Sequence, residues 1–499
     1  MEIGIDMKEQ KKKEISLKEN TFFNMLKTVC TIMLPLITFP YSSRILHAQN
    51  IGKINFGTSI VNYFTLIAAL GIPTYAVREC SRVKNNTEQF SQTVNEIFSI
   101  NIVSTIISYF ILIGCLIFVP DLKGYTILIL IQSIPIIFTT LGADWINTTM
   151  EDFKYIAIRT LIVQLFILLA MFIFVKEEKD YYNYAVIFML STSAANIVNI
   201  IYRRKFCKTK FILKMNIKKH SIPIMMLFAT TLSQTILPSI DMTMLGIAQG
   251  DVSVGLYSTA AKIINCVSQV VISIAWVVMP KLSYDFANKN YNRINNMLYK
   301  VSLLTVTVGM PCVVGINVIA PELIEIFGGH EYVGASSCMQ IMTITMAIGF
   351  IVNILGNMIL IPLMKEKQFM IACVVSVGVN IILNGIMIPL WNMNGAAVAT
   401  VMSSLVMILI ATLKFDKNIH IKNLKKVFTE VFVGCLCIVI SAWIIKMFLN
   451  GIWVTTIAVI FVSVVIYAAV LLLFKNEVAL QIINILKKLL FAITKKNCH

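Results

Sequence analysis

The sequence predicts an all-α, polytopic membrane protein, and three observations carry this prediction. Of the 499 residues, 58% are hydrophobic and only 13% are charged, whereas a soluble domain carries about 25% charged residues. Apolar runs of about 20 residues, the length that crosses a bilayer as a helix, recur along the chain. Short basic segments separate these runs, so the net charge of +17 is a topology signal and does not indicate a nucleic-acid partner.

Fourteen runs are long enough to cross the membrane, and they predict two six-helix lobes with two additional C-terminal helices. The runs lie at 22–43, 55–77, 97–119, 125–147, 155–175, 184–202, 221–246, 254–279, 301–326, 338–362, 369–389, 395–413, 428–448 and 453–474. The predicted organisation is a tail (1–20), a first lobe (21–202), a basic linker (203–220), a second lobe (221–413), the two additional helices (414–474) and a basic tail (475–499).

The distribution of basic residues predicts the orientation. The N-terminal tail and every second connection hold 33 Lys and Arg residues, and the opposite connections hold six. Because cytoplasmic segments carry the excess of positive charge, both termini are expected in the cytoplasm. The first apolar run ends without a small-residue cleavage site, so no cleaved signal peptide is expected.

Lys262 is the most informative single residue, because it is the only charged residue between Asp251 and Lys281. Inserting a lysine near the middle of a span costs about 2.5–3.5 kcal/mol on translocon scales, so such a residue is expected to face a partner or a water-filled cavity. Other residues share its helical face at spacings of three, four or seven: Ser258, Asn265, Gln269 and Trp276.

An internal repeat extends this polar face to the first lobe. Moving the chain along itself by 203 residues aligns three identical pairs: Gly52 with Gly255, Ile60 with Ile263, and Asn62 with Asn265. The same offset aligns Asn55, Ser59 and Asn62 with Ser258, Lys262 and Asn265. Both segments begin on the predicted outer side, so the repeat is parallel. Transporters commonly bind their substrates at the interface of such repeats.

The seventh run adds polar residues and a carboxylate in Thr230, Gln234 and Asp241, with Pro238 expected to kink the helix. We expect Gln234 to line a cavity with the polar stripes of the two repeats. For Asp241 two interpretations stay open: an ion pair with Lys262 that joins two helices, or a role in substrate binding or proton coupling.

The remaining intramembrane polar residues have structural interpretations. Arg44, Arg78 and Glu151 lie at span ends, where snorkelling to headgroups is usual. Glu322 and Glu325 are expected at the interface, and Asp144 and Arg159 are expected to pair. The asparagines at 353, 357, 380 and 384 are expected to form hydrogen bonds between helices.

The chain carries no signature of an enzyme. It contains no P-loop, no GxSxG sequence, no nucleophile–base arrangement outside the membrane and no loop long enough for a catalytic domain. Its eleven cysteines form no CxxC pair and no cluster with histidine, so neither a disulfide framework nor a metal site is expected. We expect a transporter without a cofactor, with H⁺ or Na⁺ coupling as an open question.

Several segments are similar in order to the polysaccharide-repeat flippases of the multidrug/oligosaccharidyl-lipid/polysaccharide exporter superfamily. These segments are FPYSSRILHAQNIGKINFGTSIVNYF with GIPTYAVRECSRVKNN, ADWINTTMEDFKYIAIR, VGLYSTAAKI with VMPKLS, APELIEIFGGHEYVGA and NIILNGIMIPLWNMNGAAVAT. The resemblance runs from about residue 30 to 410, so it covers most of the chain. Two positions depart from the family pattern: Ala76, where a glycine is expected, and Ser403–Ser404, near which an acidic residue is expected.

The resemblance implies two six-helix bundles around a central cavity in a bacterial plasma membrane. It implies movement of an undecaprenyl-pyrophosphate-linked oligosaccharide from the cytoplasmic to the outer leaflet for surface polysaccharide synthesis. Arg44, Arg78 and Lys262 would then meet the pyrophosphate, which needs cationic hydrogen-bond donors in low dielectric. Membrane lipids, a polysaccharide polymerase and glycosyltransferases are the other expected partners.

Three alternatives remain at this point. A lipid II flippase shares the polyprenyl anchor and differs in the sugar. A drug antiporter of the same superfamily binds cations and would need acidic residues where this chain has basic ones. A scaffold or regulatory membrane protein is the alternative outside transport, and it would not need aligned polar stripes in both halves.

Overall fold

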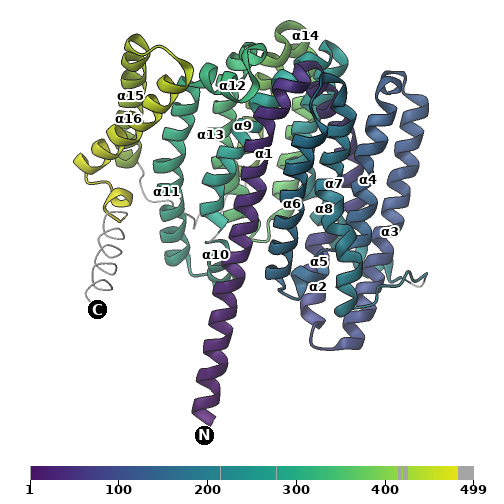
Figure 1. Ribbon diagram of the computed structural model, residues 1–499. Coiled ribbons are helices and arrows are strands. Elements are labelled where there is room, and N and C mark those ends of the chain that lie inside the picture. Colours follow the sequence, from purple (N-terminus) through teal and green to yellow (C-terminus); the bar gives the residue numbers. More distant parts are fainter. Residues whose placement is uncertain (1, 214, 277, 414–418, 420–424, 482–499) are drawn as a thin grey trace. The chain divides into compact units, whose positions relative to one another are not determined.

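The computed structural model describes residues 2–213, 215–276, 278–413, 419 and 425–481, and the regular elements of these residues are helices (Figure 1). The chain divides into two compact units, Met1–Gly255 and Leu256–His499. The fold class predicted from the sequence, an all-α polytopic membrane protein, is therefore confirmed.

The first unit contains the helices up to α8, and α9 crosses its boundary. These are α1 (Glu2–Ala69), α2 (Ile72–Val83), α3 (Thr87–Phe118), α4 (Thr126–Gly142), α5 (Trp145–Thr149), α6 (Phe153–Phe174), α7 (Tyr181–Tyr202), α8 (Ile217–Gln249) and α9 (Asp251–Trp276). The second unit holds α10 (Met279–Ala287), α11 (Tyr291–Val318), α12 (Ala320–Gly328), α13 (Ser336–Asn353), α14 (Glu366–Thr412), α15 (Lys425–Phe448) and α16 (Ile452–Leu473).

Ten helical stretches in the described residues are long and apolar enough to cross a membrane. Two of them contain a break: α1 leaves helical geometry at His47, and α14 does so at Asn392. Each break falls between two runs that the sequence assigned to separate spans. The count of fourteen spans stays a prediction, as do the predicted lobe boundaries.

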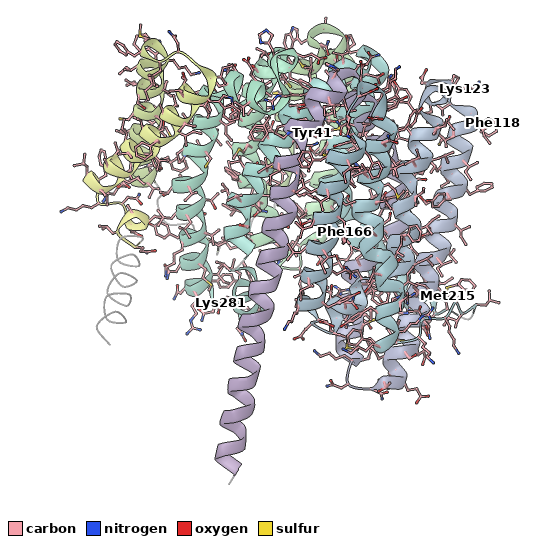
Figure 2. The ribbon with its side chains drawn as sticks, viewed as in Figure 1. Tyr41, Phe118, Lys123, Phe166, Met215 and Lys281 are labelled. Carbon is pink, nitrogen blue, oxygen red and sulfur yellow. The ribbon has the colours of Figure 1, made fainter. Side chains whose placement is uncertain are left out.

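The two ends of the first unit carry different connections. Phe118 and Lys123, beside the α3–α4 connection, lie at one end of this unit, and Met215 of the basic linker lies at the other (Figure 2). The alternation of basic and non-basic connections predicts this arrangement. Which end faces the cytoplasm stays a prediction.

Two glycines bring α1 against the first turn of α9. A Cβ atom on Gly52 would lie 1.8 Å from the carbonyl oxygen of Asp251, and one on Gly255 would lie 2.1 Å from the carbonyl oxygen of Ala48. Real Cβ atoms are essentially never this close to a backbone oxygen, so both positions require glycine. Ala48 and Asp251 are 203 residues apart, as are Gly52 and Gly255. The two contacts are therefore equivalent: the offset of 203 residues relates Gly52 to Gly255 and Ala48 to Asp251.

The same offset relates two unusual backbone conformations. His47 has φ 60° and ψ 168°, and Gly250 has φ 82° and ψ 179°. This region of conformational space is essentially restricted to glycine. The two helical hairpins thus turn in the same way, and the first does so with a histidine that carries backbone strain.

The C-terminal helices are tied to the second unit by polar contacts. The Lys446 Nζ on α15 donates to Glu322 Oε1 at 2.5 Å and to the carbonyl oxygen of Val318 at 2.8 Å. The Tyr467 hydroxyl on α16 donates to the carbonyl oxygen of Thr307 on α11 at 2.7 Å. Glu322, expected only to lie at the interface, therefore also joins α12 to α15.

We expect Gly52→Ala and Gly255→Ala each to destabilise the protein, because the added methyl group must push two backbones apart. Overpacking of this kind costs about 1–3 kcal/mol or more. The readout is the unfolding midpoint of the detergent-solubilised protein together with its monodisperse yield. Gly114→Ala is the matched control, because nothing lies within 4 Å of its added Cβ. Equal midpoints for the three variants would contradict the close approach.

We expect His47→Gly to be more stable than His47→Ala. Both variants lose the imidazole, but only glycine adopts this backbone conformation without strain, which is worth about 1–3 kcal/mol. Unfolding midpoints measured under the same conditions test the difference. Gly250→Ala should show the converse loss at the equivalent position of the repeat. An alanine variant as stable as the glycine variant at residue 47 would show that the strain is absent.

Candidate functional site

The polar stripe predicted in the first repeat lies against α8. The Ser59 and Tyr63 hydroxyl groups lie 2.9 Å and 3.0 Å from Thr243 Oγ1, and Asn62 Nδ2 donates to Ser239 Oγ at 3.3 Å. The sequence analysis missed Tyr63, Ser239 and Thr243. The i,i+4 spacing of Ser239 and Thr243 in the seventh run was the signal that could have identified this face.

Asp241 belongs to the same stretch of α8 and is the buried carboxylate of this region. Only 1% of the residue is exposed, and it lies in sequence between the two residues that meet the α1 stripe. Its predicted pair with Lys262 would join the two units and stays a prediction. The side chains of Gln234, Thr230 and Trp276 lie outside the residues whose side chains the structure describes.

Asn55 and Ser59 also form hydrogen bonds within their own helix. Asn55 Nδ2 donates to the carbonyl oxygen of Ile51 at 2.9 Å, and Ser59 Oγ donates to that of Phe56 at 2.7 Å. Ser59 is buried, whereas Asn55 is half-buried. A cavity-lining role for these residues stays a prediction, and the described conformation uses Ser59 to hold two helices together.

The polar face of α9 changes from buried to exposed along the helix. Ser258 is buried, Lys262 is half-buried, and Asn265 and Gln269 are exposed. A helix that packed its whole stripe into a core would not show this gradient. The exposure of the side chains on this face therefore increases along α9, and a solvated face that begins near Lys262 stays a prediction.

The two arginines assigned to the headgroup are exposed, and the structure does not bring them together. Arg44 precedes the break in α1, and Arg78 lies on α2 at the opposite end of the first unit (Figure 1). The intervening helix, 48–69, is about 30 Å long at 1.5 Å per residue. One pyrophosphate is far too small to contact both arginines at once, and a headgroup role for either residue stays a prediction.

The predicted pairing of Asp144 with Arg159 is confirmed. Arg159 Nη2 donates to Asp144 Oδ1 at 2.9 Å, and Arg159 is buried. Asn147 Nδ2 also donates to Asp144 Oδ1 and to Asn199 Oδ1. The charges of Asp144 and Arg159 are therefore satisfied by partners within the first unit.

Asn380 and Asn384 lie in a buried polar cluster between the two segments of α14, before and after its break. Asn380 Nδ2 lies 3.4 Å from Thr400 Oγ1 across the break, and Asn384 Nδ2 donates to Asn380 Oδ1 at 3.0 Å. Ser376 Oγ donates to the carbonyl oxygen of Ser403 at 2.7 Å. Asn380 thus contacts the helical segment after the break, as expected. The backbone carbonyl group of Ser403 accepts a hydrogen bond in the same buried region. For Asn353 and Asn357 this role stays a prediction.

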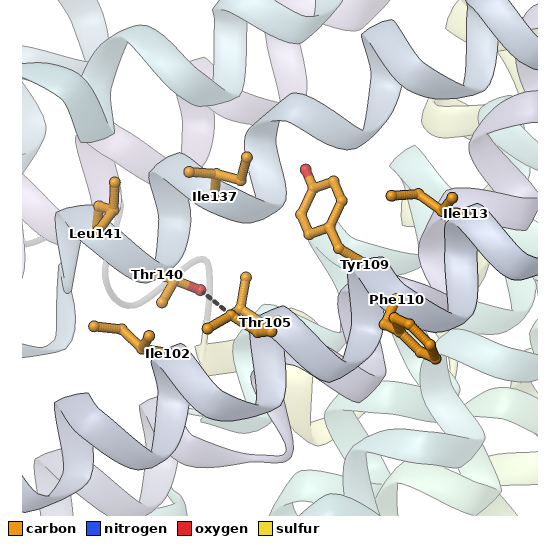
Figure 3. Close-up of a pocket in the computed structure, with 9 residues that line it drawn as sticks. Ile102, Thr105, Tyr109, Phe110, Ile113, Ile137, Thr140 and Leu141 are labelled. Carbon is orange, nitrogen blue, oxygen red and sulfur yellow. Dashed lines mark hydrogen bonds between the residues drawn. The ribbon is translucent and has the colours of Figure 1, made fainter. Parts of the chain in front are cut away.

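A groove between α3 and α4 is apolar and differs in kind from the polar faces. It has a volume of about 420 Å³, and the hydroxyl groups of Thr105 and Thr140 share one hydrogen bond of 2.7 Å on its wall (Figure 3). Ile106, Phe110 and Ile137 line it with hydrocarbon. No cation lines this groove, so it offers nothing to a phosphorylated headgroup. In the described residues no three His, Cys, Asp or Glu side chains cluster as metal ligands.

The ten helical stretches that are able to cross a membrane define a polytopic membrane protein. Residues 17–284 match the family model described as polysaccharide biosynthesis protein, and residues 227–386 match the model described as MatE. The first match covers more than half of the chain. The chain therefore belongs to the polysaccharide biosynthesis protein family, the polysaccharide-repeat flippases of the exporter superfamily.

Curated relatives and a solved structure agree with this assignment. The chain is 24% identical over 366 residues to a putative O-antigen transporter of Shigella dysenteriae, with 70% of this chain and 88% of the relative covered. It is 21% identical over 363 residues to a putative O-antigen transporter of Escherichia coli strain K12, with 71% and 86% covered. The fold matches the lipid II flippase MurJ in an inward closed conformation with a TM-score of 0.72 at 18% identity, over 92% of this chain and 100% of that one.

Proposed function

We propose that this protein moves an undecaprenyl-pyrophosphate-linked oligosaccharide repeat unit from the cytoplasmic to the outer leaflet by alternating access. The observation that carries the proposal is Lys262, a half-buried cation on the polar face of α9, a helix that the sequence predicts to cross the membrane. A pyrophosphate that leaves water needs such a donor, because an unpaired anion in low dielectric is expensive.

The remaining residues take roles that follow from their chemistry. Arg44 and Arg78, at opposite ends of the first unit, would meet the headgroup at the two stages of entry and release. Asn265 and Gln269 would form hydrogen bonds with the glycan, and the polyprenyl chain would remain in lipid. A glycosyltransferase would supply the repeat unit, and a polymerase would consume it, so both are the expected functional partners.

Lipid II is the second candidate substrate, and the fold likeness to a lipid II flippase favours it. The two lipids share the anchor chemistry that Lys262 recognises and differ in the saccharide. The names of the curated relatives favour the polysaccharide precursor. A drug antiporter fits less well, because its cationic substrate would be repelled by Lys262 and the two arginines.

We expect Lys262→Gln to lower export of surface polysaccharide by about 10- to 100-fold, because a charge-assisted hydrogen bond is worth about 1.5–3 kcal/mol. Lys262→Arg should restore part of the activity. Export is measured in cells that contain equal amounts of each variant in the membrane. Lys281→Gln removes an exposed lysine on α10 and should leave export unchanged. Export at the wild-type level by a stably inserted Lys262→Gln variant would contradict the proposed role of Lys262 in binding the headgroup.

Coupling through Asp241 predicts that Asp241→Asn lowers export and changes its dependence on external pH, because the amide binds neither a proton nor Na⁺ as a carboxylate does. Export is compared across external pH and Na⁺ concentration. Asp121→Asn is the control, because it removes an exposed carboxylate from the α3–α4 connection. Unchanged export at every pH and Na⁺ concentration would refute this role for Asp241.

A further inference from the structure

A histidine at the start of α8 is completely buried in the first unit, and neither the headgroup role nor the polar stripes use it. His220 has no exposed surface. Its Nδ1 lies 2.6 Å from the Tyr75 hydroxyl on α2, and its Nε2 lies 2.8 Å from Glu96 Oε2 on α3. We refer to Tyr75, Glu96 and His220 as the imidazole cluster.

The surroundings of the imidazole cluster are apolar. A core of buried hydrophobic residues contains Tyr75, and its other members include Phe90, Ile97, Trp145 and Ile224. Gln92 Nε2 donates to the second carboxylate oxygen, Glu96 Oε1, at 3.2 Å. A histidine–carboxylate pair in such a setting is costly to bury unless hydrogen bonds satisfy it, and here every ring nitrogen has a partner.

The hydrogen bonds define how many protons the cluster holds. With a neutral imidazole, the Tyr75 hydroxyl donates to Nδ1, and the Nε2–H group donates to the Glu96 carboxylate. Every polar atom is then satisfied, but one net negative charge remains in the apolar core. A single additional proton cancels this charge, and an imidazole is the side chain that ordinarily changes charge near neutral pH.

Other ionisable groups lie on the elements around the cluster, and the structure shows which of them contact it. Arg78 and Glu79 lie on α2, Lys218 and Lys219 on α8, and Arg203, Cys207, Lys208 and Lys210 on the linker that packs against α3. Of the carboxylates on these described elements, Glu96 is the one within hydrogen-bond distance of His220. Lys218, Lys219 and Arg78 are exposed, so water screens their charges.

The imidazole cluster also connects to a candidate headgroup residue. The Arg78 guanidinium carbon lies 5.9 Å from the centre of the Tyr75 ring, which is within cation–π range. When the cluster gains a proton, Nδ1 becomes a donor, and the Tyr75 hydroxyl must turn to another acceptor. The protonation state of the cluster therefore changes the hydrogen bonding of Tyr75, the side chain that Arg78 contacts.

We propose that the imidazole cluster of Tyr75, Glu96 and His220 is a proton-binding site through which a proton gradient drives the transport cycle. This inference rests on the proposed function, because it names the coupling ion and assigns the coupling to a site other than Asp241. The cluster joins the first turn of α8 to α2 and α3, and α8 contains prolines at 223 and 238, where helices bend readily. A proton that enters here changes the contacts that hold the end of α8.

Histidine-selective ¹⁵N NMR of the full-length protein in nanodiscs tests proton binding without a substrate. His220→Gln assigns the signal, since the carboxamide provides one donor and one acceptor but takes up no proton. The ring nitrogens of His220 should change from neutral imidazole to imidazolium chemical shifts when the pH of the sample is lowered, because an imidazole is the side chain that takes up the additional proton. Glu96→Gln should displace this transition. A His220 that remains neutral throughout would overturn the proposal.

Stability of the His220→Gln variant is not required for this test. If the variant does not fold, Glu96→Gln and Tyr75→Phe assign the same signal by the shifts that they cause in the two ring nitrogens. Tyr75→Phe retains the histidine–carboxylate pair and should keep a transition to imidazolium. His330→Gln is the matched control, because His330 pairs with Glu325 at 3.3 Å but is exposed, and it should leave the His220 signal unchanged.

Transport into proteoliposomes tests the coupling itself. Wild-type transport of an undecaprenyl-pyrophosphate-linked oligosaccharide should respond to an imposed pH gradient, and one coupled proton changes the equilibrium accumulation about tenfold per pH unit. His220→Gln should lose this response while retaining downhill transport. A His220→Gln variant that keeps the full response would overturn the proposal. If wild type moves no lipid-linked oligosaccharide, the proposed function fails, and the NMR experiment still decides whether the proton site exists.

Discussion

The close approach of α1 to the first turn of α9 is the contact on which the internal symmetry depends. Each of Gly52 and Gly255 lies against a backbone carbonyl group of the other segment, and the offset of 203 residues exchanges the two contacts. A side chain at either position would separate the backbones. Because the contact is symmetric, Gly52 and Gly255 occupy equivalent positions at the start of the two polar stripes in the sequence.

Two buried ionisable side chains of the first unit, Arg159 and His220, are each paired with a carboxylate. Arg159 is neutralised by Asp144, and the carboxylate of Glu96 is hydrogen-bonded to His220. Removing one partner of such a pair is costly, because the other charge stays buried. Arg44 and Arg78 differ from these residues, because both side chains are exposed.

The separation of Arg44 from Arg78 constrains how a headgroup can be handled. The two residues flank one helix that is able to cross the membrane, so in the proposed function a headgroup would meet them in succession. A strong site for pyrophosphate would trap the lipid, whereas several weaker sites at different depths allow entry and release. The break at His47 places Arg44 beside a strained turn, and Tyr75 places Arg78 beside the imidazole cluster.

The sequence alone determined the fold class, the family and several individual contacts. Long apolar runs have few alternatives to a membrane-spanning helix, because every backbone polar group must be satisfied within lipid. The pairing of Asp144 with Arg159 also followed from their positions at successive helix ends. Only the tertiary structure decided which polar residues meet. Ser59 lies against Thr243, and His220 lies between Tyr75 and Glu96, although 145 and 124 residues separate the histidine from these two partners. Helical periodicity identifies the face on which a side chain lies, but the packing of distant helices determines the partner that this face meets.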